Sequence, residues 1–181
     1  MSIKKALIYK VVVIGDGGVG KTSLVLQYTE KKFTEQYVMT IGSNFAIKKV
    51  EIPEYPDLEV RLQLWDLAGQ RHFSFVRPPF YRGAAAIMYV FDVTRRSSFT
   101  NLPNWKEEAE KVIGHKPSVM LGNKIDLAQE YREVGSEEGR ALSEEYDSGG
   151  YFETSAKTGG NIKEAFKSLV LAIIKKVNLE L

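Results

Sequence analysis

The stretch that decides the fold is Gly15-Asp16-Gly17-Gly18-Val19-Gly20-Lys21-Thr22. It matches the pattern G-x-x-x-x-G-K-[ST] of a phosphate-binding loop. The apolar run at residues 11–14 is short and rich in β-branched side chains, which indicates a buried strand. After the loop, Leu24 and Tyr28 are four residues apart, as on one face of a helix. Strand, glycine loop and helix form the context that the pattern requires.

The residue types of this loop suit a bound phosphate. Gly17, Gly18 and Gly20 let backbone N–H groups approach an anion without interference from Cβ atoms. Lys21 supplies a mobile charge for the outer phosphates, and Thr22 supplies a hydroxyl ligand for Mg²⁺. The alternative is a structural glycine turn that happens to precede Lys-Thr. The predicted nucleotide-binding residues of the loop are Gly17, Gly18, Val19, Gly20, Lys21, Thr22 and Ser23.

Length and composition exclude several functional classes. The chain has 181 residues, 44% of them hydrophobic, which suffices for a single domain, residues 1–181, whose residues 1–8 form a short leader. A formal net charge of +2 gives no bulk field that would attract nucleic acid. No apolar stretch is long enough to span a membrane, and no cysteine offers a thiol for catalysis or lipidation. We therefore expect a cytoplasmic monomer without a direct membrane anchor, which reaches membranes only through a partner or a missing C-terminal tail.

The hydrophobic pattern alternates strands with helices. We expect strands at residues 9–14, 45–52, 58–66, 84–92, 118–124 and 150–154. Helices are expected after the glycine loop, at 98–114, at 136–146 and after Asn161, which is placed to cap the last one. This order predicts an α/β fold, with a doubly wound, mainly parallel six-stranded sheet and helices on both faces.

A second motif ends the strand predicted at 58–66. In a doubly wound sheet, ligands bind beyond the carboxyl ends of the strands. There, Asp66 is placed to hold Mg²⁺ through water, and Gly69 to offer its N–H to a terminal phosphate. Gln70 is placed to orient an attacking water through its amide. We therefore predict Gln70, Lys21 and Gly69 as the catalytic residues.

Two further motifs suit a guanine base. The carboxylate of Asp126 matches the N1–H and N2–H₂ donors of guanine, a pair that adenine lacks. Asn123 is placed to tether the base edge or the neighbouring loops, and the stem of Lys124 to pack on the ring. The segment Ser155-Ala156-Lys157 is placed to offer the Ala156 N–H to the guanine O6. Each motif alone is also compatible with an ordinary polar turn.

These four motifs, in this order, resemble a Ras-superfamily small GTPase over essentially the whole chain, and most closely the Rab branch. The Rab-like stretches are Thr-Ile-Gly-Ser-Asn-Phe at 40–45, Arg-Leu-Gln-Leu-Trp-Asp-Leu-Ala-Gly-Gln at 61–70, Phe-Tyr-Arg-Gly-Ala at 80–84 and Phe-Asp-Val-Thr at 91–94. The resemblance implies the P-loop GTPase fold (the G domain), bound GTP or GDP, and Mg²⁺.

The resemblance also implies roles for residues outside the glycine loop. Thr40 joins Mg²⁺ in the triphosphate state, Phe33 lies edge-on to guanine, and Tyr37 closes over the phosphates. The implied metal ligands are thus Thr22, Thr40 and Asp66. Effector, exchange-factor and GTPase-activating proteins are expected at the switch regions and at an aromatic patch formed by Phe45, Trp65 and Phe80.

Some residues depart from the Rab pattern. Leu67 and Arg71 stand where Rab proteins usually have Thr and Glu, and Pro78-Pro79 should break or restart the helix there. Arg71 is either an internal arginine finger or an exposed charge, and the exposed charge is favoured. We expect His72 and His115 to be solvated and Trp105 to be a helix packing residue.

The sequence thus predicts a small GTP-binding molecular switch that hydrolyses GTP to GDP and phosphate slowly, with a Rab-like role in vesicle or membrane trafficking. The alternative is a nucleotide-locked interaction module with negligible hydrolysis. Gln70 and Thr40 favour the switch, whereas Leu67, Arg71 and the two prolines keep the alternative open. A metabolic nucleotide kinase is disfavoured, because the chain shows no motif for a second substrate or a lid.

Overall fold

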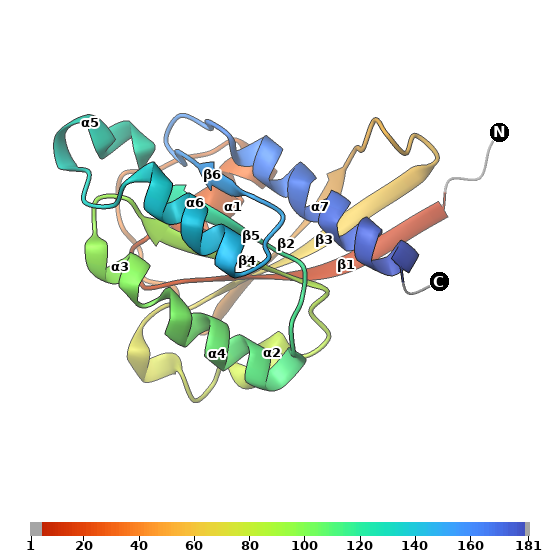
Figure 1. Ribbon diagram of the computed structural model, residues 1–181, viewed down its shortest axis with the longest axis horizontal. Coiled ribbons are helices and arrows are strands. Elements are labelled where there is room, and N and C mark those ends of the chain that lie inside the picture. Colours follow the sequence, from red (N-terminus) through yellow and green to blue (C-terminus); the bar gives the residue numbers. More distant parts are fainter. Residues whose placement is uncertain (1–4, 180–181) are drawn as a thin grey trace.

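A six-stranded sheet forms the centre of the structure, a computed structural model that describes residues 5–179 (Figure 1). The strand order is β2-β3-β1-β4-β5-β6, with β2 and β3 antiparallel and the other neighbours parallel. The predicted doubly wound, mainly parallel sheet is confirmed. Its strands are β1 (Lys5–Ile14), β2 (Ser43–Val50), β3 (Leu58–Leu67), β4 (Ala86–Asp92), β5 (Ser118–Asn123) and β6 (Tyr151–Glu153).

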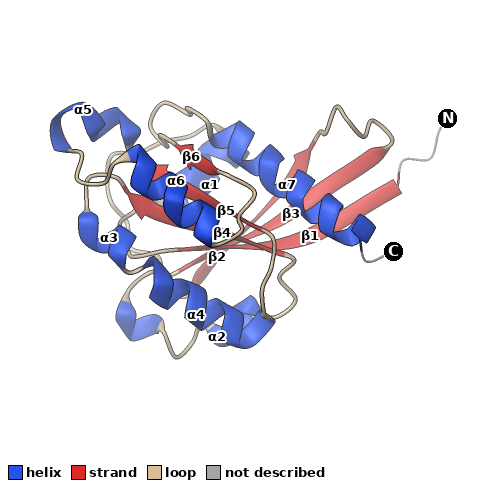
Figure 2. Ribbon diagram, in the orientation of Figure 1, coloured by secondary structure: helices blue, strands red, loops and turns tan. Residues whose placement is uncertain are grey.

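Helices cover both faces of this sheet (Figure 2). Along β1, Val11 and Val13 face a core shared with α1 and α7, whereas Val12 and Ile14 face a core shared with α2, α4 and α6. Successive side chains of a strand point to opposite faces, so one apolar run supplies both cores. The helices are α1 (Lys21–Glu30), η1 (Arg71–Phe73), α2 (Pro78–Tyr81), α3 (Arg96–Thr100), α4 (Leu102–Ile113), η2 (Ile125–Leu127), α5 (Ala128–Tyr131), α6 (Ser136–Glu145) and α7 (Ile162–Leu179).

The expected leader at residues 1–8 is wrong in its second half. Strand β1 already begins at Lys5, which pairs with Leu58 at the start of β3. The side chains of residues 5–8 are exposed or half-buried, so they lack the apolar run by which the sequence marks the rest of the strand. Residues 1–4 lie outside the described part of the chain.

Two helix predictions at 98–114 and Asn161 also need correction. The single helix becomes α3 and α4, because Pro103 in the first turn of α4 has no N–H to continue the ladder of α3. Asn161 adopts a left-handed backbone (φ 60°), and its side-chain amide donates to the carbonyl of Glu153 instead of accepting from the helix. The predicted restart at Pro78 is confirmed, since α2 begins there.

The ends of the other predicted elements agree with the structure to within a residue or two, whereas the short helices η1, η2 and α5 were not predicted. Between residues 5 and 179, no helix combines the length and the apolar character needed to cross a membrane.

Candidate functional site

The glycine loop connects β1 to α1 and wraps around a lysine. The side chain of Lys21 is 5% exposed, and its ammonium donates to the carbonyls of Gly15 (2.7 Å) and Asp16 (2.9 Å). Burial lowers the pKa of Lys21 to about 8, an effect that the nearby Asp66 carboxylate partly opposes. Gly20, with φ 99°, precedes the helix in a left-handed conformation that favours glycine. The loop therefore holds a cation at the amino end of a helix, where anions bind.

Gly17 and Gly69 allow close approach of the loop and the segment after β3. A Cβ on Gly69 would lie 2.3 Å from the backbone nitrogen of Gly17, and a Cβ on Gly17 would lie 2.7 Å from Nε2 of Gln70. The side chain of Gln70 thus lies directly over the phosphate loop. Its Nε2 donates to the hydroxyl of Tyr37 (2.9 Å), whereas its Oε1 is buried without a partner among the described residues.

Three oxygen-bearing side chains meet beside the start of α1. The hydroxyl of Thr22 lies 2.7 Å from that of Thr40 and donates to Oδ2 of Asp66. Asp66 is 1% exposed, and burial raises its pKa, although Lys21 and Thr22 oppose this effect. Its Oδ1 has no partner in the described part of the chain. One carboxylate with an orphaned oxygen and two hydroxyls are the hard donors that Mg²⁺ prefers.

A cavity of about 390 Å³ opens between these groups. The phosphate loop lines one side, and Gly69 and Gln70 line another. Residues 33–40 form the outer wall, where Phe33 is 40% exposed and Tyr37 is 63% exposed. Of the residues predicted to bind the base, Lys124 lines the cavity, whereas Asn123, Asp126 and residues 155–157 lie outside its lining.

At the base end, Asn123 ties three segments together. Its Nδ2 donates to the carbonyl of Val19 (2.9 Å), and its Oδ1 accepts from the hydroxyl of Thr154 (3.1 Å) and the N–H of Ala156 (3.3 Å). Of the two functions predicted for Asn123, the structure therefore shows the tether between loops. The Ala156 N–H, predicted for a base oxygen, donates to Asn123 here.

The other base-site residues are engaged with protein groups. Asp126 Oδ1 accepts from the hydroxyl of Ser155 at 2.7 Å, which holds the carboxylate at the edge of the site. Lys124 adopts a left-handed backbone (φ 68°), and its ammonium lies 3.0 Å from the carboxylate of Asp92. Lys157 pairs with Glu35 at 2.9 Å and thereby links this end to the outer wall of the cavity.

The three residues of the predicted aromatic patch are in contact. Trp65 packs against Phe45 and Phe80, with ring centroids 5.0 and 5.8 Å apart. Phe45 is 50% exposed, and the ammonium of Lys10 lies 4.8 Å from the Trp65 ring centroid. The patch thus combines exposed apolar surface with positive charge.

Several contacts of the site were missed by the sequence analysis. Arg77 is 3% exposed, and it bonds Glu108 and the carbonyls of Ala68 and Gln70. Trp105 is more than a packing residue, because its indole N–H donates to Asp16 in the phosphate loop. The partners of these side chains are far away in sequence, so no local spacing marks them.

Arg95 also reaches the phosphate loop, where its guanidinium donates to the carbonyl of Gly17 at 2.7 Å. In contrast, Arg71 is exposed, as favoured from the sequence. His115 is exposed, and its ring lies 3.0 Å from the Glu110 carboxylate. His72 is exposed, and its ring is tilted by 44° against that of Phe73.

Comparison with known proteins agrees with this geometry. The family model described as the Ras family matches residues 10–175. The chain belongs to the Ras family. The GTP-binding protein yptV5 of Volvox carteri is 44% identical over 171 residues, which cover 92% of this chain and 82% of that protein. The GTP-binding protein YPTC5 of Chlamydomonas reinhardtii is 43% identical over 172 residues, with the same coverage of both chains.

A Rab protein is among the relatives of this Ras-family chain. The Ras-related protein Rab7 of Cenchrus ciliaris is 40% identical over 181 residues, which cover 97% of this chain and 86% of that protein. The Rab-like character predicted from the stretches at 40–45, 61–70, 80–84 and 91–94 is therefore confirmed, and the chain is a Rab-like small GTPase of the Ras superfamily.

Proposed function

We propose that this single-domain chain binds GTP with Mg²⁺ and hydrolyses it slowly to GDP and phosphate. The observation that carries the proposal is that the phosphate loop, Thr22, Thr40 and Gln70 line one cavity, with the Asp66 carboxylate bonded to Thr22 behind its wall. Phosphates would lie against residues 17–23, where the loop N–H groups, Lys21 and the positive end of α1 neutralise their charge.

For the metal, the donor set supports Mg²⁺ at Thr22, Thr40 and Asp66. Mg²⁺ at such a site neutralises charge on the outer phosphates. Within residues 5–179, no three His, Cys, Asp or Glu side chains gather as a protein-only cage. This agrees with a metal that usually retains waters and phosphate ligands.

For the base, we propose guanine, held by Asp126 and by the segment Ser155-Ala156-Lys157. Ser155 orients the carboxylate through a 2.7 Å hydrogen bond, and Phe33 lies at the cavity wall where a ring edge is accessible. Asn123 and Lys124 complete this end. Lys124 would exchange its contact with Asp92 for one with the base ring, or would keep the ion pair and pack through its stem.

For hydrolysis, Gln70 would orient a water toward the terminal phosphate, with the Gly69 N–H and Lys21 facing the developing charge. The Gln70 amide already lies against Gly17, on the side of the loop where a terminal phosphate would sit. Tyr37, bonded to Gln70, would close the cavity over the phosphates.

The decisive experiment is single-turnover hydrolysis of bound GTP, with Gln70→Leu as the variant. We expect slow turnover in the wild type, since no arginine of the described residues lines the cavity. Gln70→Leu should be slower still, with GTP binding largely intact. A wild-type protein that binds GTP with Mg²⁺ but releases no phosphate would contradict the proposal.

One observation favours a second function, a nucleotide-locked interaction module. The Gln70 amide donates to Tyr37 and is therefore not free to turn toward water in this arrangement. In such a module, the wild type would hydrolyse GTP negligibly, and Tyr37→Phe would raise the rate, since Gln70 is then released. In the proposed GTPase, the wild type already shows measurable turnover, and the variant retains it.

We further propose that the switch segments and the Phe45, Trp65 and Phe80 patch bind effector, exchange-factor and GTPase-activating proteins. Exposed aromatic clusters of this kind commonly mark binding surfaces. The relatedness to Rab7 supports a role in vesicle or membrane trafficking.

A further inference from the structure

Arg77 is a buried arginine whose hydrogen bonds and ring contact join the segment of the proposed catalytic glutamine to α4. Its Nε and one terminal nitrogen donate to the two carboxylate oxygens of Glu108, at 2.6 and 2.8 Å. The other terminal nitrogen donates to the carbonyls of Ala68 (3.0 Å) and Gln70 (3.1 Å). Tyr81 donates to the same carboxylate at 2.7 Å, which fixes Glu108 in turn.

The two carbonyls that Arg77 binds flank Gly69. This segment lies between the end of β3 at Leu67 and the start of η1 at Arg71. Its backbone is held at one end by the Ala68 N–H bonded to the Gly42 carbonyl and at the other by the Gln70 carbonyl, which accepts from the Phe73 N–H of η1. The orientation of the backbone that carries the Gln70 side chain therefore depends on a few individual bonds, of which Arg77 makes two. A planar guanidinium makes these bonds and the bidentate ion pair at once, whereas an ammonium does not.

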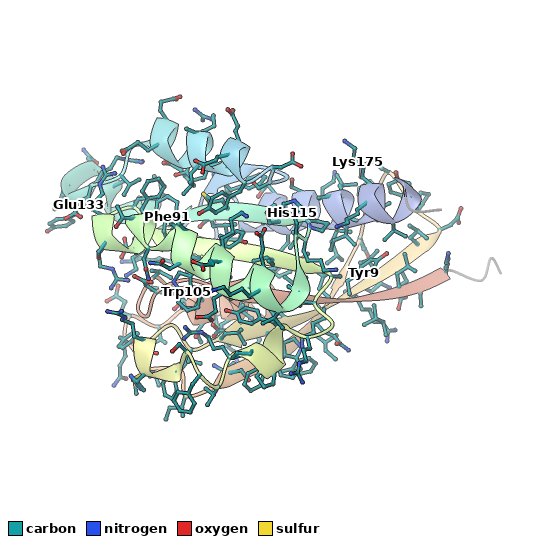
Figure 3. The ribbon with its side chains drawn as sticks, turned by 60° about the horizontal axis from the view of Figure 1, so that its bottom comes forward. Tyr9, Phe91, Trp105, His115, Glu133 and Lys175 are labelled. Atoms are coloured by element: carbon teal, nitrogen blue, oxygen red, sulfur yellow. The ribbon has the colours of Figure 1, made fainter. Side chains whose placement is uncertain are left out.

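The same guanidinium stacks on Trp105, which is also bonded to the phosphate loop. The Arg77 Cζ atom lies 4.3 Å from the Trp105 ring centroid, within cation–π range. The indole N–H donates to Asp16 Oδ1 at 2.8 Å, and Asn101 donates to the same oxygen at 2.6 Å. Figure 3 shows Trp105 between α4 and the segment that carries η1 and α2. One indole thus contacts both the phosphate loop and the arginine that holds Gln70.

We propose that Arg77, braced by Glu108 and Trp105, is the positioning residue that places Gln70 for hydrolysis. The inference rests on the proposed GTPase activity and deepens it. Arg77 does not line the cavity, so it acts only through the backbone of Ala68 and Gln70. Its removal should therefore slow hydrolysis without weakening nucleotide binding, and the loss should not exceed the loss caused by removing Gln70 itself.

The test is Arg77→Lys, assayed for single-turnover GTP hydrolysis, for GTP and GDP affinity and for thermal unfolding. The lysine keeps the charge beside Glu108 but loses the fork that reaches the carbonyls. We expect hydrolysis to fall on the order of 10- to 100-fold, as for a slightly misplaced catalytic group, with both affinities unchanged. Arg140→Lys is the matched control, because Arg140 is exposed on α6 and pairs with Glu137 at the surface. The control should hydrolyse GTP at the wild-type rate.

A double-mutant cycle separates positioning from general stability. If Arg77 acts through Gln70, Arg77→Lys should have no further effect on hydrolysis in a Gln70→Leu background. Glu108→Gln provides a second variant if Arg77→Lys does not fold. Glu108→Gln keeps the shape of the side chain that binds Arg77 but removes its charge. It should slow hydrolysis in the wild-type background and have no further effect in the Gln70→Leu background.

The possible results are distinct. The positioning role would be overturned if Arg77→Lys slowed hydrolysis equally in the wild-type and Gln70→Leu backgrounds. It would also be overturned if the Arg77→Lys single variant hydrolysed GTP at the wild-type rate. Weaker binding of both nucleotides with unchanged turnover would assign Arg77 to structure alone and also overturn it. A wild-type protein without turnover would instead overturn the proposed GTPase activity, and the positioning role with it.

Discussion

At the scale of single residues, Gly17 is the position where a small change should have a large effect. A Cβ there would lie 2.7 Å from Nε2 of Gln70, closer than ordinary contacts allow. We expect Gly17→Val to displace the Gln70 side chain and to slow single-turnover hydrolysis by roughly 10-fold or more, with GTP still bound. Gly135→Ala is the control, because its Cβ would meet only the flexible end of Glu138 at 3.4 Å. Wild-type turnover in Gly17→Val would show that Gln70 does not act from its observed place.

Lys21 gives the second residue-scale prediction, which concerns pH. Its pKa of about 8 in the folded protein lies below its usual value of 10.5, because burial disfavours the charged form. At pH values between about 8 and 10.5, the unfolded chain binds a proton at Lys21 that the folded chain has released. The free energy of unfolding should therefore rise with pH in this range. For the nucleotide-free protein, the gain by pH 9.5 should be about 1–2 kcal/mol relative to Lys21→Met.

This prediction is checked by denaturant unfolding at several pH values from about 7 to 9.5, at the upper end of which tyrosines, with an ordinary pKa of about 10, begin to ionise in both proteins alike. The difference between wild type and Lys21→Met isolates the lysine from other groups. Addition of GDP and Mg²⁺ should remove the pH dependence, since a bound phosphate keeps the ammonium charged. Parallel stability curves for the two nucleotide-free proteins would show that Lys21 titrates outside this range.

At the scale of elements, α4 acts as a support for the phosphate loop. Asp16 receives hydrogen bonds from Trp105, on α4, and from Asn101, the residue before this helix. We expect Trp105→Phe, which keeps an aromatic ring but removes one donor, to speed GDP release roughly tenfold. A hydrogen bond to a charged group contributes about 1.5–3 kcal/mol. The measurement is the release of a fluorescent GDP analogue, with Lys111→Ala on the exposed face of the same helix as control. Equal release rates in Trp105→Phe and wild type would show that Asn101 alone holds Asp16.

The helices and strands that could be predicted from the sequence are determined by residues that lie close together in the chain. The strands before the phosphate loop and before Asn123 contain apolar runs, and the strand before Asp66 alternates apolar and polar residues. The Pro78 restart follows from the missing N–H of proline. The same property of Pro103 split the helix predicted at 98–114, where it had not been taken into account. Backbone chemistry within a few residues is therefore sufficient for most of the fold.

The contacts between elements were not predictable in the same way. In the sequence, Arg77 is marked only by the two prolines that follow it, and Trp105 only by its place in a helical pattern. Their partners, Glu108 and Asp16, come from other segments and meet them only after the sheet has brought α2, α4 and the phosphate loop together. The motif residues of the site were predictable because their spacing is characteristic, whereas the residues that position them have no such spacing.

At the scale of the whole molecule, the site joins a rigid sheet to two segments held by few bonds. Residues 33–42 contact the rest of the site through Thr40 with Thr22, Tyr37 with Gln70, and Glu35 with Lys157. The backbone of the segment at 68–77 is held to the rest of the molecule by the bonds of Arg77 and by the Ala68 N–H bonded to the Gly42 carbonyl. The Phe45, Trp65 and Phe80 patch draws its rings from β2, β3 and α2, so it borders both segments.

We therefore expect nucleotide-dependent protection from amide hydrogen exchange that is confined to these two segments. A GTP analogue that resists hydrolysis, with Mg²⁺, should protect residues 33–42 and 68–77 more than GDP does, because only the triphosphate bridges Thr40 and Gly69. The buried strands β4 and β5 serve as the internal reference and should exchange equally slowly in both states. Chelation of Mg²⁺ should remove the extra protection at residues 33–42 first, since the Thr40 hydroxyl then has no metal ion to bind. Equal protection of both segments in the GDP and triphosphate states would mean that the nucleotide is bound without switching, as in the nucleotide-locked module.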